Sequence, residues 1–123
     1  MNSNAINWFE IPATDLGRAQ SFYAQVLNTP LQRETMCGQE MAIFPHNVEH
    51  GAGGCVVQSQ DLSPSQSGAV IYLSVADSID AALERTSKAG GRVALGKTAL
   101  SEGMGHYAHI IDSEGNRIGL HAV

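Results

Sequence analysis

Residues 8–27, WFEIPATDLGRAQSFYAQVL, have the pattern of a strand followed directly by an amphipathic helix. A strand is predicted over residues 5–13, where successive side chains alternate between two faces as far as Pro12. Thr14 or Asp15 is the expected N-cap of the following helix. Five apolar side chains recur there at helical spacing: Leu16, Ala19, Phe22, Tyr23 and Val26. We expect this apolar stripe to pack against a sheet.

The same order of elements occurs again in the second half of the chain. Residues 61–68, DLSPSQSG, have no hydrophobic periodicity and are predicted to connect the halves. Beyond them, residues 71–91, IYLSVADSIDAALERTSKAGG, predict a strand, an N-cap at Asp77 or Ser78, and a helix that ends at two glycines. The complete set of further strands is expected at residues 31–36, 40–44, 55–58, 70–75, 92–97, 106–111 and 117–122.

This pattern predicts an α+β fold built from two tandem β-α-β-β-β modules. Residues 1–61 are expected to form the first module and residues 68–123 the second, within one domain that spans residues 1–123. Aligning Asp15 with Asp77 relates the modules by one constant offset, under which Glu10 matches Tyr72. Duplicated modules bring equivalent strands together around a shared axis, so we expect a pocket between them.

The composition excludes several classes of protein. The chain has 123 residues, of which 43% are hydrophobic, and this suits one compact domain. Its net charge is −5, so we expect no nucleic-acid partner and no attachment to an anionic membrane. No apolar run approaches the roughly 18 residues of a spanning helix. The first residues lack the features of a secretory signal, so a cytoplasmic protein is expected, with Cys37 and Cys55 as free thiols.

The segments 8–27, 71–91 and 109–123 (HIIDSEGNRIGLHAV) resemble the glyoxalase, bleomycin-resistance and extradiol-dioxygenase superfamily, also called vicinal oxygen chelate proteins. The most specific features are the Asp-Leu start of the Ala/Phe-Tyr helix and the Asp-x-x-Gly-Asn turn at residues 112–116. The resemblance implies curved mixed sheets that enclose a pocket, usually in a homodimer. It also implies a divalent metal held by one side chain from each of four strands, with substrates that chelate it through adjacent oxygens.

The four metal-ligand positions of that family fall on Trp8, Val57, Val70 and Gly119. None of these residues offers an oxygen, imidazole or thiolate donor, so we expect no metal cofactor at these positions. The resemblance then favours a protein that binds a small organic molecule in the pocket between the modules. The alternative is a metal-dependent, glyoxalase-like lyase or a dioxygenase whose metal site has shifted to include Glu10 or His121.

Five residues are candidates for the site. Glu10 has the parity of Trp8 on the first strand, so a buried carboxylate with a raised pKa is expected there, as a catalytic base or as one partner of a salt bridge. Tyr72 occupies the matching place in the second module and can donate a hydrogen bond to a ligand. His109 and His121 are expected ligand contacts on the last two strands, although a surface or dimer role is open for His121. Trp8 is expected to line the cavity.

One motif is not expected to be functional. Residues 46–50, HNVEH, fit the H-x-x-E-H zinc pattern, which requires both histidines on one helical face. Pro45 precedes the motif and a glycine-rich stretch, residues 51–54, follows it, so a helix long enough to carry the pattern is not predicted. The segment is expected at most to trap stray zinc or nickel.

Overall fold

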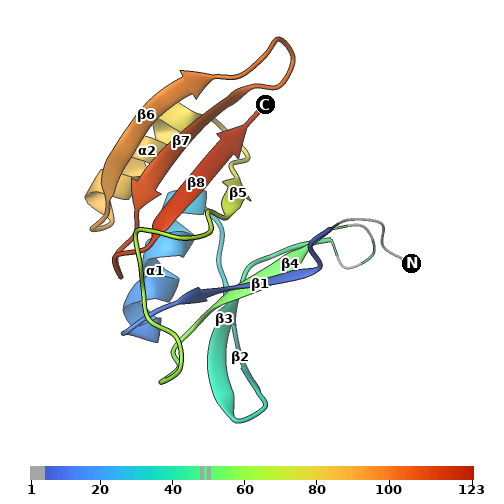
Figure 1. Ribbon diagram of the computed structural model, residues 1–123, viewed down its shortest axis with the longest axis vertical. Helices are drawn as coiled ribbons and strands as arrows, with labels where there is room; N and C mark the ends of the chain where they lie inside the picture. Colours follow the sequence, from blue (N-terminus) through green and yellow to red (C-terminus); the bar gives the residue numbers. More distant parts are fainter. Residues whose placement is uncertain (1–4, 48, 50) are drawn as a thin grey trace.

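Each half of the chain folds into a four-stranded mixed sheet with one helix packed on it (Figure 1). The computed structural model describes residues 5–47, 49 and 51–123. The first half, with sheet A in the order β1-β4-β3-β2, consists of β1 (Trp8–Pro12), α1 (Leu16–Leu27), β2 (Gln32–Met36), β3 (Gln39–Ile43) and β4 (Gly53–Val57). The second half, with sheet B in the order β5-β8-β7-β6, consists of β5 (Tyr72–Ser74), α2 (Ile79–Lys88), β6 (Arg92–Ala99), β7 (His106–Ile111) and β8 (Arg117–Ala122).

The two sheets have the same topology. β1 pairs in parallel with β4, and β5 pairs in parallel with β8, whereas the remaining neighbours are antiparallel. The predicted α+β class and the doubled β-α-β-β-β order are therefore confirmed. Figure 1 shows the sheets as separate arrays that do not close into one barrel.

Both helices begin at the capping residues that the sequence offers. The Asp15 side chain accepts a hydrogen bond from the Arg18 backbone N–H at 3.0 Å, and Ser78 accepts one from Ala81 at 3.1 Å. α1 ends at Asn28, which adopts the left-handed conformation with φ 55°. The buried residues of α1 are the five predicted ones: Leu16, Ala19, Phe22, Tyr23 and Val26.

One hydrophobic core joins the two halves, because α1 packs on α2 and side chains of both sheets belong to the same buried cluster. The two motifs that carry the family resemblance also contact each other across this junction. Tyr23 on α1 donates a hydrogen bond to Asp112 Oδ2 at 2.5 Å, and Asn116 donates to the Pro12 carbonyl at 2.7 Å. Burial, and next the Asp112 charge, raise the pKa of Tyr23 well above its usual value.

Glu114, in the turn between β7 and β8, makes a second junction between the halves. Its carboxylate accepts hydrogen bonds from the backbone N–H groups of Thr14 and Asp15, both at 2.9 Å, and from Arg18 Nε at 2.7 Å. Burial alone would raise the pKa of Glu114, but these hydrogen bonds lower it to about 2. The turn of the second half thus holds the start of α1 in the first half.

The structure corrects the strand boundaries and the assumption of one constant offset between the modules. β4 begins at Gly53, ahead of the predicted start at Cys55, and β5 is confined to Tyr72–Ser74. A Cβ at Gly54 would collide with the Phe9 ring, so glycine allows this early pairing of β1 and β4. At the helix starts, the cap that corresponds to Asp15 is Ser78 and not Asp77.

The pairing register differs between the sheets as well. Glu10 lies opposite Cys55 in sheet A, whereas Tyr72 lies opposite Gly119 in sheet B. The position on β4 that corresponds to Gly119 is therefore Cys55 and not Val57. One offset fails because the connections between strands differ in length between the halves.

Candidate functional site

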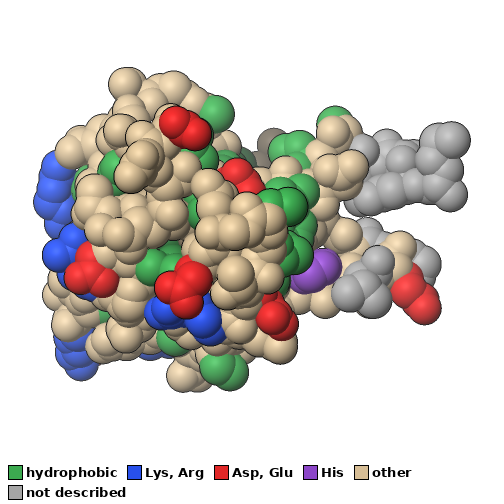
Figure 2. Space-filling model, turned by 90° about the horizontal axis from the view of Figure 1, so that it is seen from below, with side chains coloured by type: hydrophobic (Ala, Val, Ile, Leu, Met, Phe, Trp, Pro, Cys, Tyr) green, Lys and Arg blue, Asp and Glu red, His purple; other side chains and the backbone are tan. Residues whose placement is uncertain are grey.

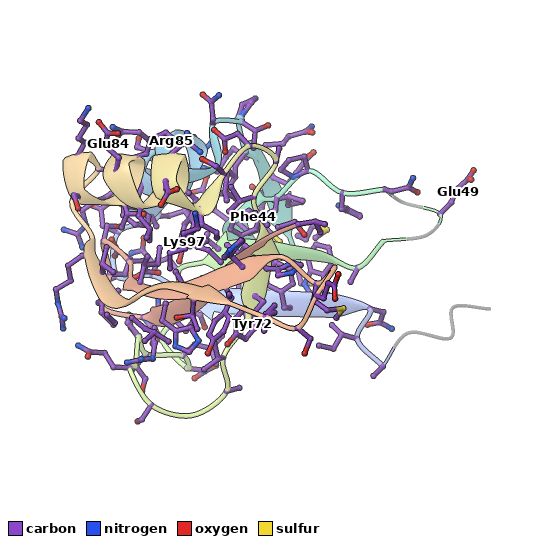
Figure 3. All side chains as sticks on the ribbon, turned by 90° about the horizontal axis from the view of Figure 1, so that it is seen from above. Phe44, Glu49, Tyr72, Glu84, Arg85 and Lys97 are labelled. Carbon is purple, nitrogen blue, oxygen red and sulfur yellow. The ribbon has the colours of Figure 1, made fainter. Side chains whose placement is uncertain are left out.

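A cavity of about 380 Å³ lies on the face of sheet B that no helix covers. Its lining residues come from β8, from its two neighbours β5 and β7, and from the β6–β7 connection: Tyr72, Ser74, Leu100, Tyr107 and His121. Figure 3 shows Tyr72 on the side of sheet B opposite Glu84 and Arg85 of α2. The volume is within the range usual for small-molecule sites.

The pleat of the strands explains which residues face this cavity. Leu73 and Leu120 pack into the core, so their neighbours Tyr72 and His121 must face the opposite side. The Tyr72 ring lies over Gly119, its partner across β5 and β8, and a Cβ at Gly119 would collide with that ring. Glycine at this position is what allows Tyr72 to lie across the sheet.

Tyr72, His109 and Arg117 form a chain of hydrogen bonds along sheet B. Tyr72 Oη lies 2.6 Å from His109 Nε2, and Arg117 Nε donates to His109 Nδ1 at 2.9 Å. The Tyr72 ring also lies edge-on to Tyr107, with ring centroids 6.1 Å apart. Burial and then the Arg117 charge lower the pKa of His109, which favours a neutral imidazole.

His121 is bound to the loop that borders the cavity. Its Nε2 donates a hydrogen bond at 2.7 Å to the carbonyl of Met104, which lies in the connection between β6 and β7. Leu100, at the start of that connection, lines the cavity. His121 therefore keeps the loop beside the cavity and leaves Nδ1 for other contacts.

A second cavity, of about 500 Å³, lies between the two halves and shares residues with the first. Phe9 and Phe44 line it from sheet A, and Tyr72 and Ser74 line it from β5. The two phenylalanine rings contact each other, with centroids 5.6 Å apart. Tyr72 and Ser74 thus border both the cavity on sheet B and the cavity between the halves.

Trp8 and Glu10 lie on sheet A, away from the other candidates. Trp8 is 37% exposed, and its ring lies edge-on to His46 with centroids 6.4 Å apart. Glu10 is exposed, so the predicted burial of its carboxylate is wrong for the single chain. Burial, and next the Glu10 charge, raise the pKa of the neighbouring Cys55 thiol to about 11. The chain brings together Tyr72, His109 and His121, and it places Trp8 and Glu10 on the other sheet.

The residues at the family's metal positions do not fit a metal ion. The side chains of Trp8, Val70 and Gly119 offer no lone pair that a metal ion can bind. Strand pairing places Cys55, in place of Val57, at the fourth position, so one thiol stands where at least three protein ligands are required. Within residues 5–47, 49 and 51–123, no group of three or more His, Cys, Asp and Glu side chains is placed to hold a metal ion. Of the HNVEH motif, Val48 and His50 lie outside the described residues.

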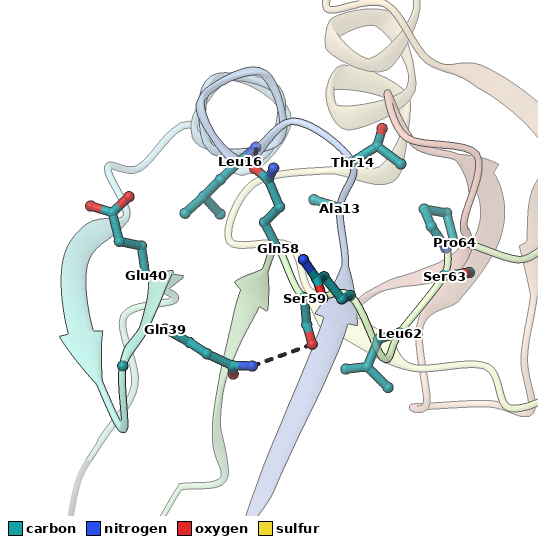
Figure 4. Close-up of a pocket in the computed structure, with 12 residues that line it drawn as sticks. Ala13, Thr14, Leu16, Gln39, Glu40, Gln58, Ser59, Leu62, Ser63 and Pro64 are labelled. Atoms are coloured by element: carbon teal, nitrogen blue, oxygen red, sulfur yellow. Dashed lines mark hydrogen bonds between the residues drawn. The ribbon is translucent and has the colours of Figure 1, made fainter.

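A third cavity, of about 640 Å³, lies beside the start of α1 and is a different kind of site (Figure 4). Polar side chains dominate its lining, and several already have partners within the chain. Gln39 donates to Ser59 Oγ at 3.3 Å, and Gln58 accepts from the Leu16 backbone N–H at 3.0 Å. These bonds already occupy polar groups of the lining within the chain itself.

Charged groups of both signs are mixed on the molecular surface. On the face shown in Figure 2, basic and acidic side chains lie next to each other, over a chain with a net charge of −5. Neither helix in the described part of the chain is long and apolar enough to cross a membrane.

The duplicated β-α-β-β-β order, with two equivalent mixed sheets, is the glyoxalase/bleomycin-resistance fold. The sequence profile of the Glyoxalase/Bleomycin resistance protein/Dioxygenase superfamily matches residues 5–120, and the chain belongs to this superfamily. The resemblance inferred from the sequence motifs is thereby confirmed.

Solved structures support the fold at low sequence identity. A glyoxalase/bleomycin resistance protein from Albidiferax ferrireducens T118 has a TM-score of 0.72 and 13% identity, over 98% of this chain and 99% of that one. The fosfomycin resistance protein FosX from Listeria monocytogenes has a TM-score of 0.66 and 16% identity, over 100% and 93%. A glyoxalase I mutant from Zea mays has a TM-score of 0.68 and 14% identity, over 94% of this chain and 45% of that chain. No curated protein matches the chain.

Four residues of the site are not among the candidates from the sequence: Ser74, Leu100, Tyr107 and Arg117. Arg117 lies on the same strand as Gly119 and His121 and alternates in phase with them, so strand parity alone places it on the cavity face. The hydrogen bond from Arg117 to His109 joins neighbouring strands and depends on the hairpin register.

Proposed function

We propose that this chain binds a small organic molecule at the sheet B cavity, without a metal at the family's usual positions. The observation that carries the proposal is the Tyr72 hydroxyl, which borders this apolar cavity and is hydrogen-bonded to His109 at 2.6 Å. A polar group held in one place above an apolar surface is what orients a ligand in small-molecule sites.

The lining residues indicate the chemistry of the ligand. The rings of Tyr72 and Tyr107 offer apolar and π surface, and Leu100 adds an aliphatic contact. The hydroxyls of Tyr72 and Ser74 in the same lining can form hydrogen bonds with a ligand. A molecule with an aromatic or aliphatic body and a polar group matches this lining.

We also propose that a second copy of the chain completes the site in a homodimer. Sheet A exposes Trp8 (37%) and Met36 (43%) on the face opposite α1, beside a small buried cluster that contains Met41 and Cys55. Sheet B exposes Tyr72 (49%) on its own uncovered face. Covering one face with the other buries apolar surface on both and brings Trp8 and Glu10 of one copy near the cavity of the other.

Sedimentation velocity tests the dimer. The wild-type chain is expected to sediment as a dimer, and Trp8→Ser is expected to shift it toward monomer. If Glu10 reaches the cavity of the second copy, Glu10→Gln weakens ligand binding while the fold stays intact. A monomeric wild-type protein at all concentrations would contradict this arrangement.

The binding proposal is tested by elemental analysis and a ligand screen on untagged protein. We expect less than stoichiometric metal, and loss of any residual zinc or nickel in the His46→Ala/His50→Ala variant. About one equivalent of zinc, nickel, manganese or iron in both proteins would instead support the shifted-site lyase or dioxygenase. Small aromatic ligands are expected to raise the melting temperature of the wild-type protein.

Two matched variants test whether the ligand binds at the Tyr72 hydroxyl. Tyr72→Phe removes the hydroxyl that is bonded to His109, and Tyr107→Phe removes a hydroxyl from the same cavity at the neighbouring ring. We expect Tyr72→Phe to weaken binding about fivefold, as the loss of one hydrogen bond does, and Tyr107→Phe to change it less. Equal affinities for the wild type and Tyr72→Phe would place the ligand elsewhere.

A further inference from the structure

His109 lies between an obligatory donor and a hydroxyl. Arg117 Nε carries a hydrogen and no lone pair, so in its 2.9 Å contact His109 Nδ1 must be the acceptor. A neutral imidazole with an accepting Nδ1 carries its proton on Nε2. His109 Nε2 therefore donates to Tyr72 Oη, which lies 2.6 Å away.

The direction of this bond decides what Tyr72 can do. Because the Tyr72 oxygen accepts from His109, its own hydrogen is not needed for that bond and can point toward the cavity. With the opposite tautomer, Tyr72 would donate to His109 and present only lone pairs to a ligand. The same three side chains thus give a donor site or an acceptor site, according to the position of one proton.

We propose that Arg117 is a positioning residue that fixes His109 with its proton on Nε2 and so makes the Tyr72 hydroxyl a donor to the ligand. The ligand class that follows is a molecule with an apolar, preferably aromatic, body and an accepting oxygen, such as a carboxylate or a ketone. This inference rests on the proposed binding function and adds to it the polarity of the site.

The surroundings of Arg117 support this role. The residue is half-buried on β8, where the Arg117 backbone N–H donates to the Ser65 carbonyl at 3.1 Å, so the connector between the halves holds this part of the strand. Its charge is also one of the causes that lower the pKa of His109 and keep the imidazole neutral. Arg117 therefore acts on both the protonation and the tautomer of His109.

Long-range ¹H–¹⁵N spectra of the histidine rings test the tautomer directly. In the wild-type protein we expect the neutral His109 ring to show a protonated Nε2 and an unprotonated Nδ1. In Arg117→Met, which keeps the aliphatic chain and removes the donor, we expect a mixture of tautomers. Arg92→Met, on the exposed edge strand of the same sheet, has the same charge change and is expected to leave His109 unchanged.

Two results would overturn the role of Arg117. One is a wild-type His109 with its proton on Nδ1, a measurement that needs no variant and does not depend on how Arg117→Met folds. The other is a His109 tautomer that changes in Tyr72→Phe but not in a folded Arg117→Met protein, because Tyr72 would then fix the proton.

Three ligands of similar size test the ligand class: benzoate, acetophenone and benzylamine. We expect benzoate and acetophenone to shift the signals of Tyr72 and His109 and to lose affinity about fivefold in Arg117→Met. Acetophenone has the acceptor without a charge, so it separates hydrogen bonding from attraction to Arg117. Stronger binding of benzylamine at these residues would overturn the inference and leave the binding proposal intact. If all three ligands leave the cavity signals unchanged, the binding proposal and the ligand class both fail, and the ring spectra still decide the role of Arg117.

Discussion

Tyr23 donates a hydrogen bond to Asp112 at 2.5 Å, and this contact joins the helix of the first half to the terminal turn of the second. Both residues are buried, and Asn116 donates to the same carboxylate oxygen at 2.9 Å. The two sequence motifs most typical of the superfamily therefore have a structural task in this chain. They hold the halves together, and the cavity between the halves is bordered by Phe9 and Phe44 on one side and Tyr72 on the other.

Tyr23→Phe is expected to destabilise the chain, because Asp112 loses a buried donor and keeps only its other partners. The loss should be about 1–3 kcal/mol in the free energy of unfolding, measured by urea denaturation. Tyr107→Phe, which removes a hydroxyl at the half-buried cavity surface, is the matched control and should change stability by about 0.5 kcal/mol or less. Equal effects of the two variants would contradict the structural role of the Tyr23 contact.

Glu114 should make the chain sensitive to acid. Its pKa is about 2 in the folded state and is about 4.3 in an unfolded chain. Because the folded pKa is the lower one, the stabilisation is complete above about pH 4.3 and is lost as pH falls toward 2. Denaturation curves measured between about pH 6 and 2 should show that Glu114→Gln loses less stability in acid than the wild-type protein does.

The exposed pair of Asp77 and Arg85 provides the control for that experiment. Hydrogen bonding to Arg85 lowers the pKa of Asp77 to about 2 as well, but Asp77 is exposed to solvent. Exposed pairs contribute little to stability, so Asp77→Asn should change the acid limb less than Glu114→Gln does. A larger effect of Asp77→Asn would contradict the assignment of acid sensitivity to Glu114.

The two free cysteines should differ strongly in reactivity. Cys37 is exposed at the turn between β2 and β3, whereas Cys55 is buried with a pKa of about 11. Because the thiolate is the reactive form, a disulfide reagent at neutral pH should label Cys37 rapidly and Cys55 only after unfolding. Mass spectrometry counts the labels, and rapid modification of Cys55 in a folded Cys37→Ser protein would contradict the buried position.

Gly119 should be required for the cavity because the Tyr72 ring occupies the space of its missing side chain. Gly119→Ala is expected to displace Tyr72 and to weaken binding of benzoate or acetophenone severalfold, as the loss of a positioned hydrogen bond does. Gly96→Ala, on an exposed strand with open space at its Cβ, is the control. Unchanged affinity and unchanged Tyr72 signals in Gly119→Ala would contradict the close approach.

The elements of this fold could be predicted from the sequence because they depend on local signals. The apolar stripe of α1, the caps Asp15 and Ser78 and the turn at residues 112–116 all follow from residue types at short spacing. The resemblance to the superfamily could be inferred for the same reason. Its motifs are two short stretches of sequence that the structure places in contact with each other.

Register and burial could not be predicted in this way because they depend on contacts between distant segments. A single constant offset between the modules made Val57 the counterpart of Gly119, whereas the strand pairing puts Cys55 there. Glu10 was predicted to be buried from its strand parity, but the sheet face that carries it is uncovered in the single chain. The contact between Arg117 and His109 likewise depends on the register of β7 and β8.

An NMR titration of chelator-treated protein with acetophenone, repeated after addition of zinc or manganese, tests whether the Tyr72 cavity binds an organic ligand without a metal. We predict shifts at Tyr72, Tyr107 and His121, with the same dissociation constant before and after metal is added. Binding that appears only with metal, or shifts confined to sheet A around Trp8 and Glu10, would contradict the account.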